Sequence, residues 1–355
     1  MDAALQSLVE RVLSAAADGT PLRLRGGGTK DFYGNLPRGE VLSTRALAGV
    51  VAYEPSELVV TVRSGTPLAE LEALIAERGQ MLAFEPPHFG EGATVGGCVA
   101  AGLAGPRRAS AGTNYGGVRD SVLGARLLDG RGQVLSFGGT VMKNVAGYDV
   151  ARVLAGSLGI LGILVEVSLK VLPRPAVETT LRFELTEAAA LTRLNEWGGK
   201  PLPISASAWS AGRLLLRLSG APAALQAARD SLGGEEVDGA PIWLEIREQR
   251  HPFFGPDAPL WRISLPSTAA PLGLGDEQLI EWGGALRWLR SNLPTAQVRA
   301  RAAALGGHAT LFRGGDRSQG VFTPLPPALA VIHRRLKSEF DPAGIFNPGR
   351  MYAEL

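Results

Sequence analysis

The sequence predicts an α+β protein in which a two-part N-terminal domain precedes a ferredoxin-like antiparallel domain. Three observations support this fold class. Strand-like and helix-like segments alternate over residues 1–90, glycine clusters punctuate residues 91–173, and the elements beyond residue 175 follow the order β-α-β-β-α-β. A chain of 355 residues is too long for one compact core, so we expect more than one domain.

Residues 1–90 are expected to form a small α/β lobe. An amphipathic N-terminal helix precedes strands at 22–25, 39–44 and 58–62. A further helix is expected to begin at Thr66-Pro67, because threonine can cap a first turn and proline suits the first helical position. Gly79 is expected to end it.

Residues 91–175 are expected to form a larger lobe. Segments 122–129 and 133–139 are predicted to pair as a hairpin around the Asp129-Gly130 turn. The alternating segment 163–172 is predicted to be a strand, and Pro-Arg-Pro at 173–175 marks a boundary.

Beyond this boundary the pattern changes to that of an antiparallel domain. The β-α-β-β-α-β order comes from predicted strands and helices at 179–185, 186–199, 204–209, 214–218, 221–234 and 242–246. A second, weaker round is expected over residues 261–312, followed by a helix at 324–340.

Composition excludes several classes of protein. With 36 basic and 34 acidic residues the net charge is +2. A charge this small does not indicate binding to nucleic acid or to a membrane surface. The single cysteine, Cys98, excludes an intrachain disulfide and suits a reducing cytoplasm. No apolar run reaches the ~18 residues of a membrane span. The four histidines are scattered, so no metal site is expected.

Common nucleotide and hydrolase motifs are absent. The chain has no G-x-G-x-x-G after a strand, no P-loop and no G-x-S-x-G elbow.

Glycine is in excess: 46 of 355 residues, which is about 13% against a typical ~7%. Gly26-Gly27-Gly28-Thr29 directly follows a predicted strand. Such a loop is either a loose turn or a backbone that approaches an anionic ligand closely, because no Cβ intervenes.

Together with two later glycine clusters, this loop resembles the FAD-binding flavoproteins of the vanillyl-alcohol oxidase/p-cresol methylhydroxylase (PCMH) type. That family carries a loop like RGGGTS, then A-T-I-G-G, then G-S-E-G-x-L-G-I, and finally F-D-P-x-x-x-x-N-P-G-[KR]. The matching segments here, in the same order, are Arg25–Thr29, Ala93–Gly97, Gly156–Ile163 and 340–350. The match runs from one end of the chain to the other.

More narrowly, the chain resembles the FAD-binding E subunit of bacterial glycolate oxidases in segments 102–108, 141–149 and 168–175. The resemblance implies a two-part PCMH-type FAD-binding domain at 1–175, with lobes 1–90 and 91–175. It also implies a cap or substrate-type domain at 176–325 and a C-terminal segment, 326–355, that returns to the FAD domain.

The implied cofactor is FAD. Its diphosphate carries two negative charges, which consecutive amides and a threonine hydroxyl can surround. No histidine or cysteine stands at a convincing point of covalent attachment, His88 included, so noncovalent FAD is expected. By residue-wise match to the family motifs, the expected cofactor contacts are Gly26, Gly27, Gly28, Thr29, Thr94, Gly96, Gly97, Gly162, Ile163, Asn347 and Arg350.

The catalytic residues stay unassigned. Family members that oxidise 2-hydroxy acids usually carry a G-D-G-N-x-H-type motif, where residues 305–314 here read LGGHATLFRG. The oxidation of a 2-hydroxy acid requires that both a proton and a hydride leave the substrate. His308 is a candidate base for this step, and Arg313 or Arg317 is a candidate clamp for the substrate carboxylate. The alternative is a strand-end histidine with no catalytic role.

Four other residues bear on the site, and for Tyr115 and for the Lys143-Asn144 pair two interpretations remain open. Leu158 stands where the family often has glutamate, so a polar contact from there is missing. Tyr115 either shields the flavin or fills space. Lys143 and Asn144 form either a functional polar cluster or a capped turn.

The resemblance implies an FAD-dependent oxidoreductase that acts on CH–OH donors within a multisubunit complex. In this interpretation the chain is a glycolate oxidase subunit that works beside a catalytic flavoprotein subunit and an iron–sulfur subunit on glycolate or a related 2-hydroxy acid. A stand-alone 2-hydroxy-acid dehydrogenase and a scaffold subunit that has lost FAD remain alternatives. We expect a cytoplasmic protein that reaches the inner face of the membrane only through partners.

Overall fold

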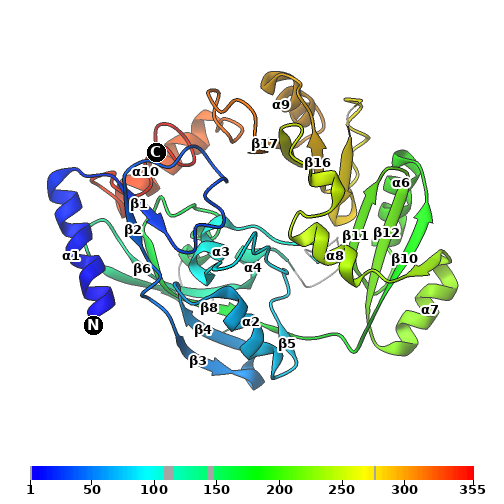
Figure 1. The fold of residues 1–355 in the computed structure, drawn as a ribbon, viewed down its shortest axis with the longest axis horizontal. Helices are drawn as coiled ribbons and strands as arrows, with labels where there is room; N and C mark the ends of the chain where they lie inside the picture. The colour runs from blue at the N-terminus through cyan, green and yellow to red at the C-terminus, as the bar shows by residue number, and fades with distance from the viewer. Residues whose placement is uncertain (1, 108–115, 142–147, 276) are drawn as a thin grey trace.

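The computed structural model describes residues 2–107, 116–141, 148–275 and 277–355. It shows two parts side by side, one around a five-stranded sheet and one around an eight-stranded sheet (Figure 1). Apart from one parallel pair near the N-terminus, the strands of the named sheets pair antiparallel. The predicted α+β class is therefore confirmed.

The N-terminal part begins with helix α1 (Ala3–Asp18) and the parallel pair β1 (Leu22–Arg25) and β2 (Glu40–Ser43). Its central sheet has the order β3-β4-β8-β6-β7. These strands are β3 (Val50–Glu54), β4 (Val59–Arg63), β8 (Ile163–Lys170), β6 (Val122–Leu128) and β7 (Val134–Gly138). The predicted hairpin is confirmed, because β6 and β7 pair along their length.

Helices and short strands complete this part. They are α2 (Leu68–Ala76), α3 (Val95–Ala101), α4 (Val118–Ser121), α5 (Val150–Val153), β5 (Gln80–Met81) and β9 (Leu172–Pro173). The predicted threonine cap on α2 is wrong. Pro67 occupies the cap position, and the Thr66 hydroxyl instead accepts a hydrogen bond from the amide of Gly49 at 3.0 Å.

The second part is one continuous sheet in the order β13-β10-β12-β11-β15-β16-β14-β17. The strands are β10 (Val177–Glu184), β11 (Ile204–Ser210), β12 (Arg213–Gly220), β13 (Glu235–Val237), β14 (Leu260–Ser264), β15 (Gln278–Glu281), β16 (Leu286–Arg290) and β17 (His308–Arg313). Its helices are α6 (Glu187–Gly198), α7 (Pro222–Leu232), α8 (Ala240–Arg247) and α9 (Thr295–Ala304). The first four strands lie in the order fourth, first, third, second, as in a ferredoxin-like unit.

One predicted strand is wrong. Residues 242–246 belong to helix α8, and the fourth strand of the first round is β13 instead. Trp243 and Ile246, three residues apart, are buried, whereas Leu244 is 43% exposed. This is a helical spacing of buried positions, and Pro241 at the helix start favours it.

The C-terminal segment lies beside β1. Helix α10 (Pro327–Phe340) leads into residues 345–347, and this stretch sits next to the N-terminal part (Figure 1). The amide of Leu22 donates to the carbonyl of Ile345 at 2.7 Å, and the amide of Asn347 donates to the carbonyl of Leu22 at 2.9 Å.

Among the described residues no helix is both long and apolar enough to cross a membrane.

A buried acid in the second part predicts a pH-dependent stability. Glu281 on β15 is 4% exposed, and the indole of Trp288 donates to its Oε2 at 2.7 Å. Burial raises the pKa of Glu281 to about 7. Between pH ~4.5 and ~7 the folded chain keeps this proton while the unfolded chain releases it, so stability falls as pH rises through this window.

We expect Glu281→Gln to remove this fall. Relative to the variant, the wild-type chain should lose on the order of 3 kcal/mol of unfolding free energy between pH 4 and pH 8. Urea denaturation at several pH values measures it, with the exposed Glu184→Gln as control. Parallel pH profiles of the wild type and Glu281→Gln would contradict the assignment.

Candidate cofactor site

The glycine loop after β1 packs directly against the segment that precedes α3. A Cβ on Gly26 would lie 2.2 Å from Thr94 Oγ1, and a Cβ on Gly27 would lie 1.7 Å from the carbonyl oxygen of Gly92. Both distances are far below van der Waals contact, so only glycine lets these two loops meet. The glycines therefore have a packing role in addition to the ligand role that the sequence analysis considered.

The same loop offers unused hydrogen-bond donors. Within the described residues, the backbone amides of Gly26, Gly27, Gly28 and Thr29 donate to no protein acceptor. Gly28 has a φ of 78°, a left-handed conformation in which side chains are strained. A run of free amides at the end of a strand is a concave donor surface suited to an anion.

Two adjoining pockets contain all eleven predicted cofactor residues. The first is lined by Gly26–Thr29, Thr94, Gly97, Asn347 and Arg350 together with residues around them. The second is lined by Gly26, Gly96, Gly97, Gly162, Ile163 and Asn347. Both pockets share Leu24, Arg25, Gly26, Gly97, Ala100, Leu158 and Asn347. The structure thus brings together segments that lie more than 300 residues apart in sequence.

Thr94 and the following glycines build the start of helix α3. The Thr94 hydroxyl accepts from the amide of Gly97 at 3.2 Å, and the amide of Gly96 donates to the carbonyl of Ser64 at 2.7 Å. A Cβ on Gly96 would lie 2.6 Å from Cβ of Ser64. The amides of Gly96 and Gly97 are therefore already used, and these residues line the pockets mainly through their small size.

Asn347 joins three segments at the floor of the site. Its Oδ1 accepts from the amide of Leu24 at 2.8 Å, and its Nδ2 donates to the carbonyl of Leu158 at 2.7 Å. The side chain is thus occupied by protein partners. Gly162 also serves packing, because a Cβ there would lie 2.7 Å from the carbonyl oxygen of Leu128 on β6.

Arg350 holds the loop that follows the glycines. Its guanidinium donates to the carbonyl of Asp31 at 2.9 Å and also to the carbonyl of Asn35. Burial lowers the pKa of Arg350 to about 10, so the side chain remains charged near neutral pH. Its positive charge thus lines the first pocket.

The first pocket is lined mainly by basic side chains, a feature that was not predicted from the sequence. Arg23, Arg25, Lys30 and Arg350 line it, with Asp31 as the acidic lining residue. Arg23 and Arg25 both pair with Asp31, at 2.5 and 2.9 Å. The signal was present in the sequence, because three of these cations flank the glycines in RLRGGGTK. Together with the free amides, this charge makes the pocket suitable for a diphosphate.

The candidate base and clamp do not come together. His308 and Arg313 are the first and last residues of β17, which places their Cα atoms roughly 16 Å apart along the strand. Arg313 instead donates to Gln249 Oε1 at 2.7 Å, and Arg317 donates to the carbonyl of Gly34 at 2.9 Å. None of the three lines the two cofactor pockets.

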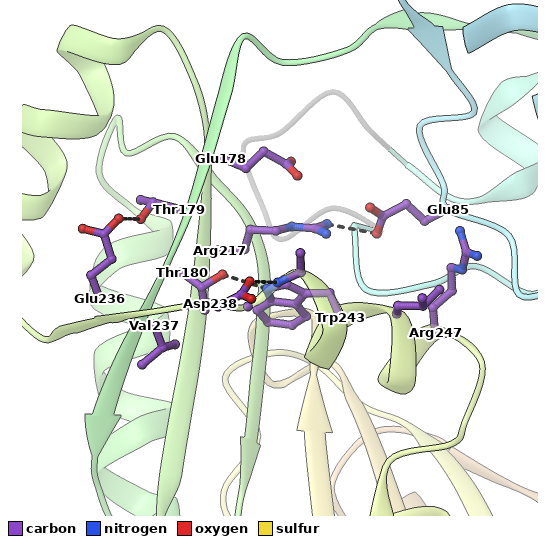
Figure 2. A pocket seen from close by; sticks show the side chains of 13 residues that line it. Glu85, Glu178, Thr179, Thr180, Arg217, Glu236, Val237, Asp238, Trp243 and Arg247 are labelled. Carbon is purple, nitrogen blue, oxygen red and sulfur yellow. Dashed lines mark hydrogen bonds and ion pairs between the residues drawn. The ribbon is translucent and has the colours of Figure 1, made fainter. Parts of the chain in front are cut away.

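A separate cavity of about 320 Å³ is lined by Glu85 of the N-terminal part and otherwise by residues of the second part (Figure 2). It shares no lining residue with the two cofactor pockets. Arg217 of β12 reaches across to Glu85 of the N-terminal part at 2.9 Å, as Figure 2 shows. Burial raises the pKa of Glu85, but Arg217 and Arg107 outweigh that effect and keep the pKa below its usual value. The paired charges identify this region as a contact between the two parts.

Tyr115, Lys143 and Asn144 lie outside the described residues. The described residues hold no group of three or more histidine, cysteine or acidic side chains that could bind a metal ion.

Comparison with known proteins identifies the family. The sequence profile of the FAD binding domain matches residues 4–149. The glycolate oxidase subunit GlcE of Escherichia coli (strain K12) is 51% identical over 350 residues, which is 99% of this chain and 98% of that protein. The chain belongs to this family of FAD-binding flavoproteins. Glycolate oxidase subunit GlcD of Bacillus subtilis (strain 168) is 30% identical over 200 residues, which is 55% of this chain and 42% of that protein.

Solved structures agree on the fold. Alkyldihydroxyacetonephosphate synthase superposes with a TM-score of 0.67 at 16% identity, covering 97% of this chain and 75% of that one. The match to the FAD binding domain and the identity to GlcE confirm the predicted resemblance. FAD is the cofactor of this family of oxidoreductases. The free amides and the basic lining of the first pocket fit FAD. Which of the eleven residues touch it stays a prediction.

Proposed function

We propose that this chain is the FAD-binding subunit of a glycolate oxidase, and that it oxidises glycolate or a related 2-hydroxy acid together with a catalytic flavoprotein subunit and an iron–sulfur subunit. The main support for this proposal is the 51% identity to the GlcE subunit over nearly the whole of both chains. The D-lactate dehydrogenase of Anaerostipes hadrus, 36% identical over 138 residues, supports a 2-hydroxy-acid substrate class.

In this proposal the cofactor lies across the two adjoining pockets. Bound FAD supplies the hydride acceptor for CH–OH oxidation. The free amides of Gly26–Thr29 hold the diphosphate, and the basic lining balances its charge. We propose that the FAD is noncovalent, and that residues 1–175 with the segment 326–355 form the FAD-binding domain beside a cap at 176–325. We also propose a cytoplasmic chain that meets the membrane through its partner subunits.

The separation of His308 from Arg313 favours a subunit over a stand-alone dehydrogenase. A base and a carboxylate clamp must both reach one small substrate, and these two residues stand at opposite ends of one strand. The full catalytic set for 2-hydroxy-acid oxidation is therefore expected to include groups from another subunit.

Turnover with and without partners tests the proposal. We expect the purified, flavin-loaded chain to oxidise neither glycolate nor D-lactate with an artificial acceptor, and activity to appear when the catalytic and iron–sulfur subunits are added. The partner subunits without this chain serve as control. Steady turnover by the isolated chain would instead establish a stand-alone dehydrogenase, and a chain unable to bind FAD would indicate a scaffold.

A further inference from the structure

Lys30 follows the glycine loop and lines the same pocket as the free amides. Its Nζ donates to the carbonyl of His88 at 3.2 Å, lies 3.5 Å from Thr29 Oγ1, and stands 5.6 Å from the ring centre of Phe89. These contacts hold the ammonium group in place, and none of them is made with a carboxylate.

The acids near Lys30 are engaged elsewhere. The carboxylate of Glu248 accepts from the backbone amides of His88 and Phe89 and from Nε of Arg247 at 2.9 Å. Glu72 bonds to the His88 ring at 2.8 Å. Among the described residues, no carboxylate forms an ion pair with Lys30.

Two of the other three cations of the pocket do have a carboxylate partner, whereas Arg350, like Lys30, forms no ion pair with a carboxylate in the described residues. Arg23 and Arg25 share Asp31 as a partner, and Arg350 donates to two backbone carbonyls. A partly buried ammonium without a carboxylate partner is costly, and an anionic ligand removes that cost. Burial lowers the pKa of Lys30, and the nearby charge of Glu248 does not fully offset that effect.

We infer that Lys30 is a binding residue for the diphosphate of the cofactor and supplies the charge that the loop amides lack. This rests on the proposed FAD-binding function of the pocket. If this is so, the contribution of Lys30 to ligand affinity should depend on the diphosphate of the ligand and not on its isoalloxazine ring. Riboflavin carries the ring without any phosphate, so it separates the two cases.

The test is a titration of the full chain, stripped of flavin, with FAD and with riboflavin, followed by flavin fluorescence. We expect Lys30→Met to weaken FAD binding at least tenfold while riboflavin binding changes less than twofold, and Lys30→Arg to keep most of the affinity for FAD. The exposed Lys200→Met is the matched control and should bind FAD as the wild type does. Circular dichroism checks folding, and Lys30→Gln replaces Lys30→Met if the latter does not fold.

Two results would overturn the inference. FAD binding by the Lys30 variants within twofold of the wild type would remove Lys30 from the site, and an equal loss of FAD and riboflavin would assign it to the ring or to packing. In both cases the wild-type chain still binds FAD, so the proposed function stands. A wild-type chain that takes up no FAD would instead overturn the function itself.

Discussion

Replacing Gly27 with alanine is expected to lower FAD retention at least tenfold. The new Cβ would lie 1.7 Å from the carbonyl oxygen of Gly92, and backbone cannot rotate away as a flexible side chain could. The glycine loop and the segment before α3 must then separate, and both line the first pocket. Overpacking of this kind typically costs about 1–3 kcal/mol, so we expect the chain to remain folded.

The ratio of flavin to protein absorbance in the purified variant measures this effect, and thermal unfolding monitors the fold. Gly198→Ala is the matched control, because its Cβ would meet nothing within 4 Å. It should keep the full flavin content. Wild-type flavin content in Gly27→Ala would mean that the contact between these two loops does not shape the cofactor site.

Replacing Lys337 with methionine is expected to cost about 3–5 kcal/mol of unfolding free energy. Lys337 is 7% exposed and Asp341 is 1% exposed. The Lys337 Nζ donates to Asp341 Oδ2 at 2.6 Å and to the carbonyls of Ile160 and Phe346 at 2.8 Å each. Removing the ammonium leaves a buried carboxylate without its cation and two carbonyls without a donor.

The loss should also reach the cofactor site, because Ile160 belongs to the glycine-rich segment Gly156–Ile163 and Phe346 precedes Asn347. Urea denaturation of the wild type and the variant gives the free-energy difference. Arg335→Met, an exposed position on the same helix, is the control and should change stability by less than about 0.5 kcal/mol. A similarly small change in Lys337→Met would show that this ion pair does not anchor the C-terminal segment.

Most of the fold follows from local patterns in the sequence. The alternating segment 163–172 and the β6–β7 hairpin could be predicted, because period-two alternation and an Asp-Gly turn are local signals. Helix α8 could not, because the pattern of residues 242–246 fits a strand or a helix, and only the burial of Trp243 and Ile246 decides between them.

The candidate site divides in the same way. The glycine clusters could be found from sequence because the family motifs are contiguous. The packing reason for Gly26 and Gly27 could not, since it depends on Gly92 and Thr94, more than sixty residues away. The missing carboxylate partner of Lys30 is likewise a property of the folded chain, because it depends on where Glu72 and Glu248 direct their oxygens.

The absorption spectrum of the purified full-length chain, recorded before and after denaturation, tests the central claim most directly. The account predicts a yellow protein with about one FAD per chain, all of it released into solution when the protein unfolds. A colourless chain that takes up no FAD from excess cofactor would contradict the account, because the free amides of Gly26–Thr29 and the basic lining of the first pocket would then not bind a dinucleotide.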